Sequence, residues 1–110
     1  MINETLERIE KELTASESLS EQRRRELLEL MGTLKAEVQE LARSNEEQAR
    51  SIAGFTQVST HEATRATRDD ALLDLSLKGL SSSVAGFEQS HPRLVQIVNS
   101  ISHTLSNLGI

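Results

Sequence analysis

Large apolar residues recur along this chain in steps that alternate between four and three positions. This spacing keeps one narrow stripe of a helix turned toward a neighbouring helix, as knobs-into-holes packing requires. The stripe predicts an all-α fold, an elongated helical bundle or antiparallel coiled coil that is completed by self-association. Its members are Leu27, Met31, Leu34, Val38, Leu41, Ile52 and Phe55 in a first run, and Leu73, Leu77, Leu80, Val84, Phe87, Leu94, Val98, Ile101, Leu105 and Leu108 in a second.

The composition indicates one small helical domain over residues 1–110 that would gain from association between chains. Only 36% of the residues are apolar and the aromatic side chains are two phenylalanines, so one copy has little with which to fill a thick core. The net charge of −5 disfavours binding to nucleic acid or to anionic lipid. No apolar run approaches the roughly 20 residues that span a bilayer. We therefore expect a soluble, cytoplasmic protein that forms a homo-oligomer, a dimer or larger, or binds a protein partner.

Interruptions of the stripe predict where the helices begin and end. Ser20 is the expected N-cap of the second helix, with a capping box from Ser18 as the alternative. The segment 58–68 lacks apolar residues over most of its length and is expected to be a polar connector, although a continuous exposed helix is the alternative. His91-Pro92 marks a junction that is either a kink or a sharp turn, since proline disfavours the helical region for its predecessor. The predicted helices cover about 3–15, 21–57, 69–89 and 92–108.

Asn45 and Gln48 are polar residues at two positions of an otherwise apolar stripe. Polar residues at such positions set register and oligomeric state. The alternative is that they line a polar gap that holds water or a ligand. The residues predicted to form the interface with a partner helix are Leu27, Met31, Leu34, Val38, Leu41, Asn45, Gln48, Ile52, Phe55, Leu80, Val84, Phe87 and His91.

No group of residues in the sequence predicts catalysis, a cofactor site or a metal site. His61, His91 and His103 lack the spacing that would bring two imidazoles onto one helical face. His91 lies on the stripe and is expected to cap the final helix. The basic run 23–25 is surrounded by glutamates, which indicates a solvated helix face. We therefore predict a non-enzymatic structural or interaction module.

Two further features bear on packing and on an alternative function. Gly79 and Gly86 lie one heptad apart beside the stripe and predict close approach of helices. Gly109 is expected to let Ile110 fold back onto the last helix. The alternative function is a small sensor module that responds to a ligand or to pH through the polar gap and the His91-Pro92 junction, because the unperturbed histidine pKa is about 6.5.

Two blocks of the chain resemble a known bacterial family, domain of unknown function 4404. The opening block reads LERIEKEL followed by LSEQRRRELLELM, and the closing block reads FEQSHPRLVQIVNSISHTLSNLGI. The resemblance implies a soluble helical bacterial protein and brings no activity, cofactor or catalytic residue. The matching positions of the closing block are Phe87, Glu88, Ser90, His91, Pro92, Leu94, Leu105, Gly109 and Ile110.

Overall fold

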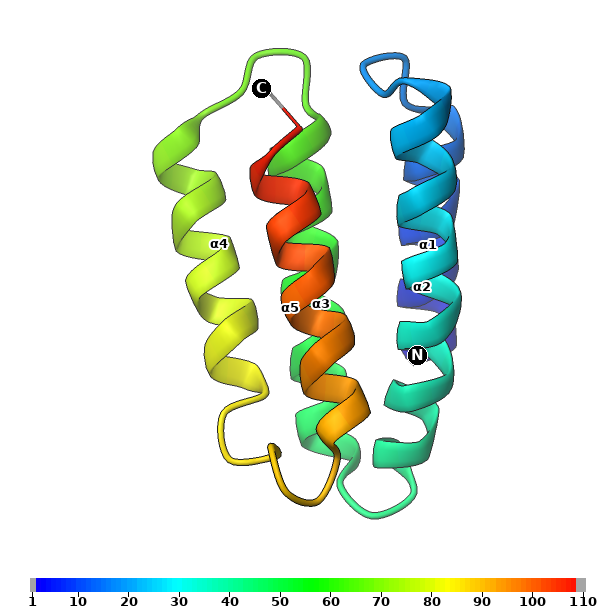
Figure 1. The fold of residues 1–110 in the computed structure, drawn as a ribbon, viewed down its shortest axis with the longest axis vertical. Helices are drawn as coiled ribbons and strands as arrows, with labels where there is room; N and C mark the ends of the chain where they lie inside the picture. Colours follow the sequence, from blue (N-terminus) through cyan, green and yellow to red (C-terminus); the bar gives the residue numbers. More distant parts are fainter. Residues whose placement is uncertain (1, 109–110) are drawn as a thin grey trace.

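Five helices make up the fold, and a computed structural model describes residues 2–108 of the chain. The described residues contain no strand, so the all-α prediction is confirmed. Each helix runs antiparallel to the one before it (Figure 1). The bounds are α1 Ile2–Ala15, α2 Glu21–Ala42, α3 Glu46–Thr64, α4 Asp70–Ser83 and α5 Pro92–Ser106.

The helices are arranged in two rows. One row holds α1, α3 and α4 side by side, and α2 and α5 cover it (Figure 1). Helix α3 is the centre of this arrangement because it contacts all four other helices, whereas α4 contacts only α3 and α5. A helix with neighbours on so many sides needs small side chains, because they let the neighbouring helices approach closely. Most of the residues that α3 buries are small. They are Ala49, Ala53, Thr56, Ser59, Thr60 and Ala63.

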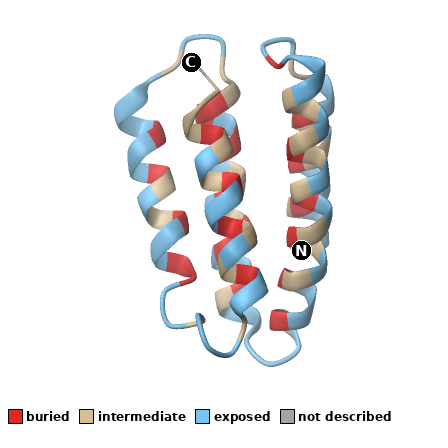
Figure 2. Cartoon of the chain, in the orientation of Figure 1, coloured by how far each residue is buried: buried red, intermediate tan, exposed pale blue. Residues whose placement is uncertain are grey.

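The apolar stripe forms the core between the two rows. Red bands of buried residues lie on the sides of α2 and α4 that face the middle of the molecule in Figure 2. Burying a leucine- or isoleucine-sized side chain contributes about 1.5–3 kcal/mol, so this core is the main source of stability. The largest fully buried side chains are Ile9, Leu13, Leu27, Leu34, Val38, Leu41, Ile52, Leu73, Leu80, Leu94, Ile101 and Leu105.

The predicted helix over 21–57 is wrong, because the chain reverses direction at residues 43–45. A continuous helix of that length would measure about 55 Å at 1.5 Å per residue, whereas the longest extent of the fold is 37 Å. Asn45 ends the reversal as the N-cap of α3, where its side-chain oxygen accepts a hydrogen bond from the Gln48 backbone N–H at 3.2 Å. Glu46 and Glu47 then stand at the positive end of the α3 dipole.

The predicted connector over 58–68 is also too long, because α3 continues to Thr64. Three threonine hydroxyls donate to the carbonyl four residues earlier in the helix, so each hydroxyl is satisfied without breaking it. The true connector is 65–69. Asp69 ends it as the N-cap of α4, accepting from the Ala71 and Leu72 N–H groups at 3.0 and 3.2 Å.

The last two predicted helices are shorter in the structure, and the junction between them is a sharp turn. Helix α4 ends at Ser83, six residues before the predicted end, and a loop over 84–91 reverses the chain. Gly86 adopts φ +93°, a left-handed conformation that side chains with a Cβ rarely take. Helix α5 ends at Ser106, and the predicted fold-back of Gly109 and Ile110 lies outside the described residues.

Ser20 is the N-cap of α2, as predicted. Its hydroxyl accepts a hydrogen bond from the Arg23 backbone N–H at 3.2 Å. Ser18, the alternative cap, has another role: its hydroxyl donates to the Thr64 carbonyl at 3.2 Å. The α1–α2 loop is thereby tied to the end of α3.

Candidate functional site

Most residues predicted to form an interface between chains are buried within one chain. Their side chains are at most 3% exposed and pack against other helices of the same copy. Other helices of the same chain therefore cover these side chains, where a partner helix was predicted to cover them. The residues concerned are Leu27, Met31, Leu34, Val38, Leu41, Ile52, Leu80 and Val84.

Asn45 and Gln48 were predicted to set register at two positions of the stripe, with a polar gap as the alternative, and their contacts in the fold are different. Asn45 is exposed in the turn before α3, where it caps that helix instead of interrupting a stripe. The side-chain amide of Gln48 donates to the carbonyl of Ser83, at the end of α4. Gln48 therefore ties α3 to the end of α4.

His91 occupies the N-cap position of α5, but its side chain makes no capping hydrogen bond, contrary to the prediction. Its Nδ1 lies 3.0 Å from the Ser90 hydroxyl, and its ring meets Phe87 edge-on with centroids 5.7 Å apart. Phe87 and His91 are half-buried in the loop before α5. Within residues 2–108, no three His, Asp or Glu side chains come together as a possible metal site.

Arg24 has a structural role that the sequence analysis missed. Its guanidinium reaches from α2 to the C-terminal end of α1, where Nη1 donates to the carbonyls of Leu13 at 2.6 Å and Thr14 at 2.8 Å. Nη2 donates to the carbonyls of Ser16 at 2.9 Å and Leu19 at 3.3 Å. The last carbonyls of a helix have no hydrogen-bond donors within it, and the Arg24 guanidinium provides such donors at the end of α1. Spacing within the sequence offers no signal for this contact.

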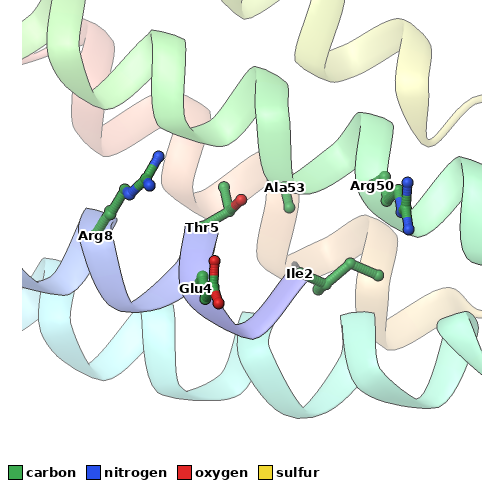
Figure 3. Close-up of a pocket in the computed structure, with 6 residues that line it drawn as sticks. All are labelled: Ile2, Glu4, Thr5, Arg8, Arg50 and Ala53. Atoms are coloured by element: carbon green, nitrogen blue, oxygen red, sulfur yellow. The ribbon is translucent and has the colours of Figure 1, made fainter.

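A hollow of about 320 Å³ lies in the groove between α1 and α3. Figure 3 shows its lining residues, with Ile2, Glu4, Thr5 and Arg8 from α1 and Arg50 and Ala53 from α3. Arg50 is ion-paired with Glu46 of its own helix at 3.1 Å, and Ala53 is the one fully buried residue of the lining. The hollow presents solvated charges on a shallow surface, and it has no buried polar side chain that would orient a ligand.

The same groove has a second hollow of about 620 Å³ at its other end. Its lining includes Glu12, His61 and Arg65, and the Arg65 guanidinium is paired at 2.9 Å with Glu62. One carboxylate oxygen of Glu12 is buried without a hydrogen-bond partner. The α1–α3 groove is thus polar and charged along its length.

The surface where α3 packs against α4 has the opposite character. It carries the large apolar side chains that the described chain leaves exposed, two from each helix. Phe55 and Val58 of α3 are 40% and 48% exposed, and Leu72 and Leu75 of α4 are 43% and 67% exposed. We call these four residues the α3–α4 face. Exposed apolar side chains gathered on two adjacent helices are typical of a protein-binding surface.

Gly79 forms the floor of the α3–α4 face. The Phe55 ring lies over it so closely that a Cβ added to Gly79 would collide with the Cε1 and Cδ1 atoms of that ring. The prediction that Gly79 permits close approach is therefore confirmed, whereas Gly86 serves the turn after α4. Phe55, predicted as an interface residue, is 40% exposed.

No helix among the described residues is both long and apolar enough to cross a membrane.

Comparison with known proteins places the chain in a family. No curated protein and no solved structure matches it. A family model described as a domain of unknown function (DUF4404) matches residues 56–110, which is half of the chain. The match covers the end of α3, all of α4 and all of the described part of α5. The chain belongs to the DUF4404 family.

Proposed function

We propose that this protein is a non-enzymatic interaction module that binds the apolar side of a partner helix on its α3–α4 face. One observation carries this proposal. Val58, Leu72 and Leu75 are 48%, 43% and 67% exposed, and they lie on two helices that pack side by side. A groove between two helices accepts the apolar face of a third helix, because side chains at helical spacing fill it. Leu75 in particular has no role in the core of one chain.

The position of α4 in the fold supports the same proposal. It contacts α3 and α5 alone, so one side of this helix has no neighbour within the chain. Large apolar side chains on that side cost solvation free energy unless another molecule covers them, at about 25 cal/mol per Å² of apolar surface. A partner helix over the α3–α4 face would recover this free energy.

The alternative function, a ligand or pH sensor, was predicted from two features, the polar gap and the His91-Pro92 junction. The polar gap that it required is replaced by a helix cap at Asn45 and a contact of Gln48 with the end of α4. The His91-Pro92 junction is the remaining support, and its role as a sensor stays a prediction. The exposed apolar surface favours the interaction module.

Site-specific photo-crosslinking in the cells that naturally express the protein tests the proposal. A photoreactive phenylalanine analogue at Leu75 should give a covalent product of higher mass, because a partner helix lies over that position. The matched control is the same analogue at Ala36, an exposed residue of α2, a helix that does not contact α4. Absence of a product at Leu75, or equal products at both positions, would refute a docking role for this face.

A further inference from the structure

We infer that the helix received by the α3–α4 face is α4 of a second copy, packed antiparallel about a two-fold axis near Leu75 and Ser76. This inference rests on the proposed function and names its partner. A two-fold interface uses the same surface on both copies, so that surface must contain its own complement. The outer side of α4 meets this condition in spacing, in its apolar contacts and in charge.

The spacing is that of a second helix-packing stripe. Leu72, Leu75, Gly79 and Ser82 follow one another in steps of three, four and three along α4. This stripe lies beside the buried one, which contains Leu73 and Leu80. Helix α4 therefore has two adjacent packing stripes, one filled within the chain and one whose Leu72, Leu75 and Ser82 are exposed.

The apolar surface beside the outer stripe also pairs with itself. The N-terminal half of the stripe carries the exposed Leu72 and Leu75, and its C-terminal half carries Ser82 and Gly79, which the Phe55 ring of the same chain covers. When two copies pack antiparallel about the middle of α4, Leu72 of each lies against the Phe55 ring over Gly79 of the other. Phe55 is 40% exposed and offers apolar surface to the incoming leucine. The two Leu75 side chains, the most exposed of the face, meet beside the axis.

The charges beside the stripe have the same symmetry. Asp74 and Lys78 are exposed on one flank of α4, one on each side of Ser76. In an antiparallel pair related by a two-fold axis, equivalent flanks face each other with their direction reversed. Asp74 of each copy then faces Lys78 of the other, which gives two opposite-charge pairs. A parallel pair would instead place this flank against the α3 side of the second copy, so Asp74 would not face Lys78.

The first test is the mass of the protein in solution, measured by light scattering after size-exclusion chromatography over a concentration series. We expect the mass of two chains at high concentration. Leu75→Glu should give the mass of one chain with an unchanged helical circular dichroism spectrum, since Leu75 is 67% exposed. Ala36→Glu adds the same charge to α2 and should leave the dimer intact.

The second test is a charge exchange that only a symmetric pair can satisfy. Asp74→Lys and Lys78→Asp should each weaken dimerisation by about tenfold or more, because like charges then face each other twice. The double variant, which restores opposite charges across the axis, should recover the wild-type dissociation constant to within about threefold.

Three results would overturn the inference. They are one-chain mass at every concentration, a dimer that survives Leu75→Glu, and a double charge variant as weak as either single one. Failure of the inference can be told apart from failure of the proposed function. A Leu75 photo-crosslink to a different protein overturns the second copy as the partner and keeps the binding face, whereas loss of all crosslinks overturns both.

Discussion

Replacing Arg24 by methionine should destabilise the fold far more than the same change at a neighbouring arginine. Methionine keeps much of the aliphatic length of the side chain and removes the guanidinium. The Arg24 side chain is 17% exposed, and its guanidinium donates four hydrogen bonds to carbonyls at and after the end of α1, at 2.6, 2.8, 2.9 and 3.3 Å. Its ion pair with Glu21 contributes little, because the Glu21 side chain is 80% exposed.

The magnitude follows from those hydrogen bonds. Each of the three shorter ones contributes about 0.5–1.5 kcal/mol net, and the positive charge beside a helix C-terminus contributes about 0.3–1 kcal/mol. Water reaches part of the vacated site, so we expect a loss of about 2–3 kcal/mol in the free energy of unfolding. For a chain of 110 residues, whose unfolding entropy is about 2.1 cal/mol/K per residue, this corresponds to a melting temperature lower by about 10 °C.

Denaturant and thermal unfolding, followed by circular dichroism, provide the measurement. Arg25→Met is the control, because Arg25 is exposed on the same turn of α2, and it should cost less than about 0.5 kcal/mol. Arg24→Lys should fall between the two, since an ammonium group keeps the charge but cannot reach four carbonyls. Equal stability of Arg24→Met and Arg25→Met would refute the assignment of Arg24 as the cap of α1.

Three smaller predictions concern single residues and are checked by the same unfolding measurements. Gly79→Ala should destabilise the protein because the new Cβ displaces the Phe55 ring, whereas Gly32→Ala, with nothing within 4 Å, should stabilise α2 by about 0.5–1 kcal/mol. A gain at both glycines would contradict the close packing of α3 and α4. Asn45→Ala should cost about 1 kcal/mol and Asn45→Asp little, as expected for an N-cap; equal losses would argue against capping. His91→Ala should cost about 1 kcal/mol or less, because the side chain makes no capping bond and loses one edge-on aromatic contact; a loss above about 3 kcal/mol would show a larger role.

The burial of the apolar stripe could be predicted from sequence, because it depends on helical periodicity alone. Leu27, Leu34 and Leu41 recur on one side of a helix whatever covers them, and all three are at most 1% exposed. What covers them is a different matter. The same stripe fits a second copy or another helix of the same chain, and only the positions of the turns decide between the two.

The turns were misread because the polar residues at them have two valid interpretations. Asn45 within a stripe suits a register-setting position as well as an N-cap. What favours the cap is a contact distant in sequence: once the chain reverses there, Gln48 reaches the carbonyl of Ser83, 35 residues later. Thr60 and Thr64 of the predicted connector likewise disfavour a helix locally, but in α3 their hydroxyls donate to carbonyls of the preceding turn, and their small size suits the crowded centre.

The candidate site follows from the way in which α3 divides the open side of the molecule into two grooves. The groove toward α1 contains Arg8, Arg50 and other charged side chains that water solvates well. The groove toward α4 contains Val58, Leu75 and their apolar neighbours, which water solvates poorly. Helix α3 contributes to both, so their difference in composition lies in the side chains that the sequence places on α3 and on its two neighbours. A chain that needed only to fold could carry polar residues in both, and the apolar groove is therefore the one expected to be covered by another helix.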